Sequence, residues 1–154
     1  YDELATASLR FFNVFGPRQD PASPYAAAIA AFASAVRAGR SPTVFGDGSQ
    51  TRDFVPVHDV ARAILLAAAR PESPRGEVHN VGTGVRRSLL DVVGLLADAA
   101  GRAVEPRFDA PRAGDVPHSG ADIGSARRAL GYEPRTDPES VLAALLAEDE
   151  TVAG

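Results

Sequence analysis

The stretch TVFGDGSQTRDFVPV, residues 43–57, says most about the fold of this chain. It holds two short apolar runs, TVF and DFVPV, on either side of a Gly-Asp-Gly-Ser segment. Glycine reaches positive φ without steric cost, so the two glycines favour a tight turn between the runs. The stretch therefore predicts a strand, a loop and a second strand.

The chain that follows alternates between helical and extended patterns. Asp59 stands directly before an apolar helical pattern and is predicted to N-cap a helix that runs to about residue 70, with Pro71 beyond its end. The run EVHNV, residues 77–81, predicts the next strand, and Gly-Thr-Gly at 82–84 predicts a tight turn.

Three more helices and one strand are predicted in the second half. Ser88 is placed to cap a helix that ends at Gly101, because serine caps the start of helices and glycine follows their ends. Residues 104–108 predict a last strand, and residues 122–130 and 138–148 predict two helices.

The start of the chain completes the alternation. Residues 6–12 predict a strand that enters a turn-rich loop at 13–21, and residues 25–38 predict a helix with one apolar face, stopped by Gly39. Strands that alternate with helices indicate the α/β class.

Composition excludes several functional classes. The formal net charge is -4 without a basic block, which argues against nucleic acid or an anionic membrane as partner. No apolar run approaches the roughly 20 residues of a membrane span. Cysteine is absent, so there are no disulfides or thiolate sites, and a cytoplasmic location is predicted.

Two further residue types are missing, methionine and lysine. All sixteen basic side chains are arginine, which excludes Schiff-base chemistry, a phosphate-binding P-loop lysine and a catalytic Tyr-Lys couple. Without methionine the chain has no initiator residue, so we expect a fragment or a trimmed chain.

Three loops carry the residue types that recognise phosphate and sugar. Loops 13–19, 46–53 and 112–115 combine arginine forks, amides and glycine, and each begins where a predicted strand or helix ends. Ligands of α/β proteins usually bind at such ends. The alternative interpretation of any single arginine is a solvated surface residue.

Metal and dinucleotide sites have little support. His58, His79 and His118 lie far apart without metal-ligand spacing, and we interpret them as mostly structural. The Gly-Thr-Gly turn lacks the third glycine of a dinucleotide fingerprint, because Arg87 stands in its place. No metal site is predicted.

Six blocks of sequence, in order along almost the whole chain, carry a resemblance to a known family. The blocks are LRFFNVFGPRQDP (9–21), SPYAAAI (23–29), TVFGDGSQTRDFVPVHDVARAI (43–64), HNVGTG (79–84), PRAGDV (111–116) and ADIGSARRALGYEP (121–134). Together they resemble the extended short-chain dehydrogenase/reductase, or NAD-dependent epimerase/dehydratase, family, and among its members the UDP-sugar 4-epimerases.

The resemblance is to the C-terminal, substrate-binding part of that family. It implies that residues 1–149 form a substrate-binding domain with the last strands of the parent fold, and that 150–154 are a loose tail. The N-terminal Rossmann core, which holds NAD in the family, would be missing.

The resemblance also implies roles for individual residues. Asn13 would bind the substrate diphosphate, and Arg52 and Arg112 would pair with its charges. Asp115 would lie beside the ribose or the second arginine. The remaining positions match short stretches around the ligands. Phe45 and Gly46 would flank the nucleobase, and Ala27 and Ala28 would border the nucleotide and sugar. Phe11 and Phe12 would lie between nicotinamide and sugar.

The implied parent is an NAD-dependent nucleotide-sugar 4-epimerase acting on a UDP-sugar or another nucleotide-sugar. The family reaction uses a Tyr-x-x-x-Lys pair, whereas Tyr1 is followed by Ala5 and the chain has no lysine. This chain alone is therefore predicted to be inactive, with NAD bound mainly by the missing part. A 4,6-dehydratase, a UDP-glucuronate decarboxylase and a non-catalytic sugar-nucleotide-binding module remain alternatives. The sugar, the base and a homodimeric parent stay open.

Overall fold

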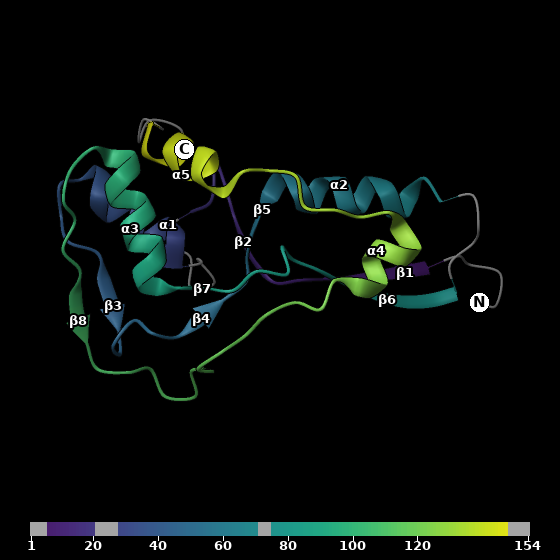
Figure 1. Cartoon of the computed structure of the whole chain (residues 1–154), viewed down its shortest axis with the longest axis horizontal. Coiled ribbons are helices and arrows are strands. Elements are labelled where there is room, and N and C mark those ends of the chain that lie inside the picture. Colours follow the sequence, from purple (N-terminus) through teal and green to yellow (C-terminus); the bar gives the residue numbers. More distant parts are fainter. Residues whose placement is uncertain (1–5, 21–27, 71–74, 148–154) are drawn as a thin grey trace.

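The computed structural model describes residues 6–20, 28–70 and 75–147, which form an elongated molecule with two lobes (Figure 1). The helical lobe contains α1 (Ala28–Arg37), α3 (Leu89–Ala100) and α5 (Pro138–Ala147). The sheet lobe contains α2 (Val57–Ala68) and α4 (Gly124–Leu130) beside a pair of strands. Each lobe has its own apolar core.

Parallel strand pairs run through both lobes. In the sheet lobe β1 (Thr6–Phe11) pairs with β6 (Arg75–Val81), and in the helical lobe β3 (Thr43–Phe45) pairs with β8 (Arg107–Asp109). Parallel pairing joins segments that are distant in the chain, because parallel strands need a crossover connection. These pairs confirm the predicted α/β class.

Two short strand pairs lie between the lobes. The pair of β2 (Asn13–Phe15) and β5 (Phe54–Pro56) is parallel, and the pair of β4 (Thr51–Arg52) and β7 (Arg87–Ser88) is antiparallel. The prediction of a loop from residue 13 was therefore wrong for β2, which three residues of ladder with β5 hold extended. Tertiary pairing of this kind leaves no local sequence signal.

The core of the helical lobe explains why α1, α3 and α5 pack together. Ile29 and Phe32 of α1 and Val92 and Leu96 of α3 are at most 4% exposed, and Leu142 of α5 is 1% exposed. Their spacing of three or four residues puts each set on one helix face. α1 lies within the predicted range 25–38, whose first three residues are outside the described part of the chain.

The predicted start and stop of α3 are confirmed. The Ser88 hydroxyl accepts from the Asp91 amide at 3.0 Å, and the Asp91 carboxylate accepts from the Ser88 amide at 2.8 Å, which forms a capping box. Gly101 ends the helix with φ of 62°. These hydrogen bonds, from the Ser88 backbone first, lower the pKa of Asp91.

Replacing Ser88 with alanine is expected to destabilise the chain by about 1 kcal/mol, because the Asp91 amide loses its acceptor. A lowered folded-state pKa means that the Asp91 contribution is present above the unfolded pKa and is lost as pH falls through the folded pKa. The measurement is urea unfolding of both proteins at neutral and acid pH. The Asp91→Asn variant should be less stable than wild type at neutral pH, and this difference in unfolding free energy should vanish in acid. A difference that stays the same in acid would contradict the capping account.

Asp59 does not N-cap α2, so that prediction was wrong. The helix begins earlier, at Val57, with Pro56 in the N-cap position. Asp59 is 1% exposed, and its carboxylate accepts from the Arg135 amide at 3.0 Å and the Thr136 amide at 3.1 Å. It therefore ties the segment before α5 to the sheet lobe.

Other predicted boundaries shift by a few residues. The last strand occupies 107–109 rather than 104–108, because it pairs with β3 there. α4 and α5 lie within their predicted ranges, and residue 148 and the tail 150–154 are outside the described residues, as is Pro71. Gly46 and Gly48 have φ of 79° and 78°, as the predicted turn requires.

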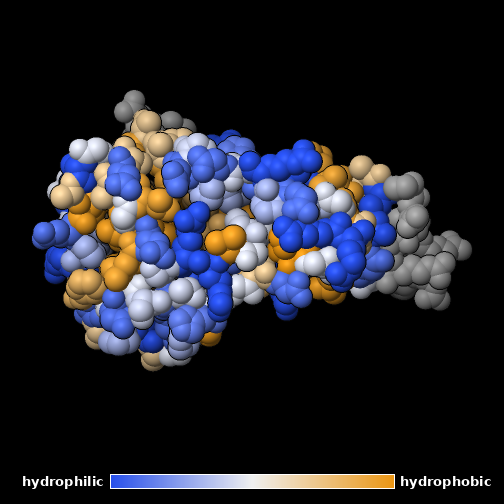
Figure 2. Space-filling model, viewed as in Figure 1, coloured by the Kyte–Doolittle hydropathy of each residue, from blue (hydrophilic) through white to orange (hydrophobic). Residues whose placement is uncertain are grey.

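Apolar side chains remain exposed on the sheet lobe. Ile64 and Leu65 of α2 are 47% and 68% exposed, and Val78 of β6 is 59% exposed. Figure 2 shows hydrophobic residues on the helical lobe too, interspersed with hydrophilic ones. Among the described residues, no helix is long and apolar enough to cross a membrane.

Candidate functional site

Two adjoining cavities open where the three arginine-bearing loops meet. The arginine cavity has a volume of about 540 Å³, and the outer groove has one of about 770 Å³. The arginine cavity is lined by Phe12, Asn13, Val14, Gln19, Ala28, Ala31, Phe32, Thr43, Phe45, Gln50, Arg52, Phe54, Leu89, Arg112 and Asp115. The outer groove is lined by Phe45, Gly46, Asp47, Ser49, Gln50, Phe108, Asp109, Pro111, Arg112, Asp115, Val116, Pro117 and His118. Phe45, Gln50, Arg112 and Asp115 belong to both.

Asn13 and Arg52 reach the arginine cavity from neighbouring strands. The backbone N–H of Asn13 donates to the backbone carbonyl of Asp53 at 3.1 Å, which fixes the start of β2 beside the end of β4. The Arg52 side chain is 13% exposed, and its guanidinium donates to the Thr51 carbonyl at 2.8 Å and forms an ion pair with the Asp115 carboxylate. This cation is held in place before any ligand arrives.

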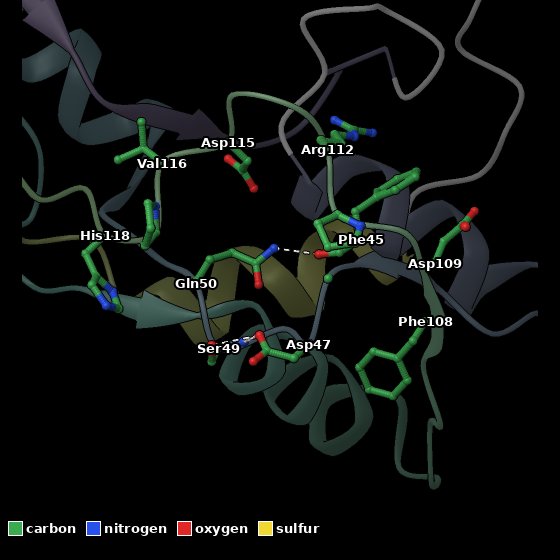
Figure 3. Close-up of a pocket in the computed structure, with 13 residues that line it drawn as sticks. Phe45, Asp47, Ser49, Gln50, Phe108, Asp109, Arg112, Asp115, Val116 and His118 are labelled. Atoms are coloured by element: carbon green, nitrogen blue, oxygen red, sulfur yellow. Dashed lines mark hydrogen bonds between the residues drawn. The ribbon is translucent and has the colours of Figure 1, made fainter.

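Arg112 lies over the ring of Phe45, with its guanidinium carbon 4.1 Å from the ring centre. A cation attracts the negative face of an aromatic ring, so the contact orients both side chains. Figure 3 shows both side chains among the residues that line the outer groove, together with Asp115. A planar guanidinium so placed can meet phosphate oxygens with two parallel hydrogen bonds.

The segment after Arg112 is fastened across β4. The Thr51 amide donates to the Pro117 carbonyl at 2.9 Å, and the Ser119 amide donates to the Thr51 carbonyl at 2.9 Å. The Thr51 hydroxyl also bonds His118 Nδ1 at 3.0 Å. These bonds bring Asp115 to Arg52 although the two are 63 positions apart.

Buried Asp53 supports the site from behind. It is fully buried, and its carboxylate accepts from the Thr83 amide and hydroxyl at 2.8 and 2.7 Å and from the Gly84 amide at 2.8 Å. The Ala121 amide adds a longer bond of 3.3 Å. Gly82 packs so close that a Cβ there would lie 2.7 Å from Asp53 Oδ2. The Gly-Thr-Gly segment, for which the sequence predicted a tight turn, is thus a bend around Asp53, whose part in it was not predicted.

Comparison with known proteins shows the family of the chain. Residues 1–82 match the NAD dependent epimerase/dehydratase family. The chain belongs to that family. Its relatives include the UDP-glucose 4-epimerase of Mycolicibacterium smegmatis, 44% identical over 80% of this chain and 38% of the relative. A putative UDP-glucose 4-epimerase of Methanocaldococcus jannaschii is 40% identical over 85% of this chain and 41% of its own length.

Solved structures of the epimerase/dehydratase family show the same fold. The UDP-glucose 4-epimerase of Thermotoga maritima, solved with UDP-glucose, matches with a TM-score of 0.83 and 38% identity over 92% of this chain and 44% of that one. The UDP-glucuronic acid 4-epimerase of Bacillus cereus, solved with UDP-glucuronic acid and NAD, matches with a TM-score of 0.83 and 32% identity over 90% and 43%. The chain therefore spans less than half the length of these relatives.

The structure brings most of the predicted site residues of this epimerase/dehydratase chain together. The arginine cavity gathers Phe12, Asn13, Ala28, Phe45, Arg52, Arg112 and Asp115, and Gly46 lines the outer groove. Phe11 lines neither cavity and is 44% exposed, and Ala27 is outside the described residues. Asp115 forms an ion pair with Arg52, and its implied place beside the ribose or the second arginine stays a prediction.

Two glutamines of the site were not singled out from the sequence. Gln19 donates to the Val14 carbonyl at 3.3 Å, and its buried Oε1 has no partner among the described residues. Gln50 donates to the Phe45 carbonyl at 2.6 Å. Both stand in loops already predicted to bind ligand, so amides within an arginine-bearing loop were the available signal.

The histidines do not gather into a metal site. His79 is 2% exposed and bonds Ser125 and Glu77 at 2.9 and 3.1 Å, which fits the structural interpretation. His118 is held by Thr51 at the outer groove. Within the described part of the chain, no group of three or more potential ligands could hold a metal ion.

Proposed function

We propose that this chain is the C-terminal, substrate-binding portion of an NAD-dependent nucleotide-sugar epimerase of the UDP-glucose or UDP-N-acetylglucosamine 4-epimerase type. The observation that carries the proposal is that Asn13, Arg52 and Arg112, from three separate loops, line one cavity. Two guanidinium forks and an amide suit the oxygens of a diphosphate. The diphosphate would occupy the arginine cavity.

The rest of the nucleotide fits the walls of the same cavity. The Phe45 ring offers an aromatic face for the base, and Asp115 offers a carboxylate to accept from ribose hydroxyls. Most of the relatives are named for UDP-sugars, and one, from Burkholderia thailandensis, is named as a dTDP-L-rhamnose 4-epimerase. We therefore propose a uracil or thymine nucleotide as ligand.

An N-terminal half would supply what the described residues lack. Homologue structures bind NAD, and when bound it would serve as hydride acceptor and donor. Of the two residues assigned to the cofactor, only Phe12 lines the cavity, and a glycine-rich cofactor loop is not found among the described residues. The exposed Ile64, Leu65 and Val78 side chains offer apolar surface for that half.

The diphosphate is expected to dominate nucleotide affinity. UDP should bind this chain about 10- to 100-fold more tightly than uridine, because charge-assisted hydrogen bonds contribute about 1.5–3 kcal/mol and each 1.4 kcal/mol is tenfold. Calorimetric titration at two salt concentrations measures the difference, which should shrink at high salt. Equal affinities of UDP and uridine would overturn the assignment of the arginine cavity.

The chain alone is expected to have no epimerase activity. It contains no Tyr-x-x-x-Lys pair, the pair with which the family removes the proton from the sugar hydroxyl. Incubation with UDP-glucose and NAD, followed by chromatography of the sugars, should yield no UDP-galactose. Turnover by the purified chain would show that the catalytic groups are here after all.

A further inference from the structure

The Gln50 side chain occupies the wall shared by the two cavities. Its Nε2 donates to the Phe45 carbonyl at 2.6 Å, which closes the Gly46–Ser49 turn onto the end of β3. The backbone carbonyl of Gln50 accepts from the Leu89 amide at 3.3 Å, at the start of α3. Gln50 is thus held from two sides, by β3 and by the first turn of a helix.

The bond to Phe45 fixes which way the amide faces. A carbonyl accepts and never donates, so the atom next to Phe45 is the NH₂ group, and the oxygen Oε1 points elsewhere. Figure 3 shows the amide with its nitrogen toward the Phe45 carbonyl and its oxygen turned away. No donor among the described residues reaches that oxygen, and Gln50 lines both cavities.

An acceptor that lines both cavities can take a donor from a bound nucleotide. Phe45 is the residue proposed to flank the base, and Arg112 covers one face of its ring. Uracil and thymine carry a ring N–H at position 3, whereas cytosine has a bare nitrogen acceptor there. A fixed acceptor therefore favours the first two bases and opposes the third, since two facing acceptors leave a desolvated group unpaired.

We infer that Gln50 determines base specificity by accepting a hydrogen bond from the ring N–H of a uracil or thymine nucleotide. This inference rests on the proposed function. The two ends of the Gln50 amide have different roles. The hydrogen bond from Nε2 to the Phe45 carbonyl orients the amide, and Oε1 accepts the hydrogen bond from the base. The base need not be covered completely, since the outer groove stays open beside Gln50.

The test compares UDP, dTDP and CDP by calorimetry on wild type and on the Gln50→Leu variant. Wild type should bind UDP and dTDP alike and CDP about 10- to 100-fold more weakly, as expected for one unpaired polar group. In Gln50→Leu the ratio of UDP to CDP affinity should fall toward one. A loss of packing alone would weaken UDP and CDP equally and leave the ratio unchanged.

Each outcome decides one claim. If wild type binds CDP as tightly as UDP, the inference is wrong. This result needs no variant, so the test remains decisive even if the Gln50→Leu protein misfolds. An unchanged ratio in a folded Gln50→Leu protein also overturns it. Tight UDP binding in either case leaves the proposed function standing, whereas failure of wild type to bind any of the three nucleotides overturns both.

Discussion

Replacing Arg52 with alanine is expected to weaken UDP binding by about 100-fold. The variant loses charge-assisted hydrogen bonds to the diphosphate, which contribute about 1.5–3 kcal/mol. It also leaves the Asp115 carboxylate without its ion-pair partner, next to the negative phosphates. Calorimetric titration measures both the affinity and whether the site remains saturable.

A matched set of variants separates these two causes. Arg52→Ala combined with Asp115→Asn should recover part of the lost affinity, because the unpaired carboxylate is gone. Arg40 is exposed and lines neither cavity, so Arg40→Ala removes the same charge and should leave UDP affinity within a few fold of wild type. Equal losses in Arg40→Ala and Arg52→Ala would mean that net charge, and not the cavity, sets the affinity.

Replacing Asp53 with alanine is expected to cost about 3–5 kcal/mol of unfolding free energy, enough to unfold a marginal chain. The change removes the acceptor of the Thr83, Gly84 and Ala121 amides from part-buried hydrogen bonds, and it leaves a gap where the fully buried carboxylate stood. Donors that lose a charged partner away from bulk water bear a desolvation cost. Thermal and urea unfolding measure the change.

An exposed aspartate gives the control for Asp53. The Asp109 side chain accepts only from the adjacent Ala110 amide among the described residues, so Asp109→Ala should change stability by less than about 0.5 kcal/mol. If Asp53→Ala were equally mild, the Gly-Thr-Gly turn would not depend on the carboxylate. The account of how the site is supported from behind would then fail.

Elements with strong local signals were predicted well from the sequence. α3 has a capping serine, an apolar face and a terminal glycine, and all three act within one helix. The turn at 46–49 follows from two glycines that need positive φ. Signals of this kind depend on neighbours in the chain, so sequence alone reveals them.

Features set by distant contacts were missed or misassigned. The short strand β2 exists because β5 lies beside it. Asp59 was predicted to be an N-cap, whereas its carboxylate accepts from the amides of residues 135 and 136. The ion pair of Arg52 with Asp115 spans 63 positions. Only the packed chain reveals such contacts, since no local periodicity encodes them.

The candidate site was predicted in part from the sequence. Its three loops were predicted because arginine, amide and glycine recur at the ends of strands, and the structure shows them around one cavity. Gln19 and Gln50 were not selected, because a glutamine in a loop is usually solvated. Their significance comes from the Val14 and Phe45 carbonyls that hold them.

The most direct test of the account is to map UDP binding by backbone amide chemical shifts of the labelled chain. The account predicts that saturating UDP shifts the amides of Asn13, of residues 45–52, of residues 112–116 and of His118. Amides around a separate cavity at the end of α1 and α3, lined by Arg37 and Arg102, should stay unchanged. Shifts confined to that cavity, or no shifts in a folded chain, would contradict the claim that this chain binds the nucleotide in the arginine cavity.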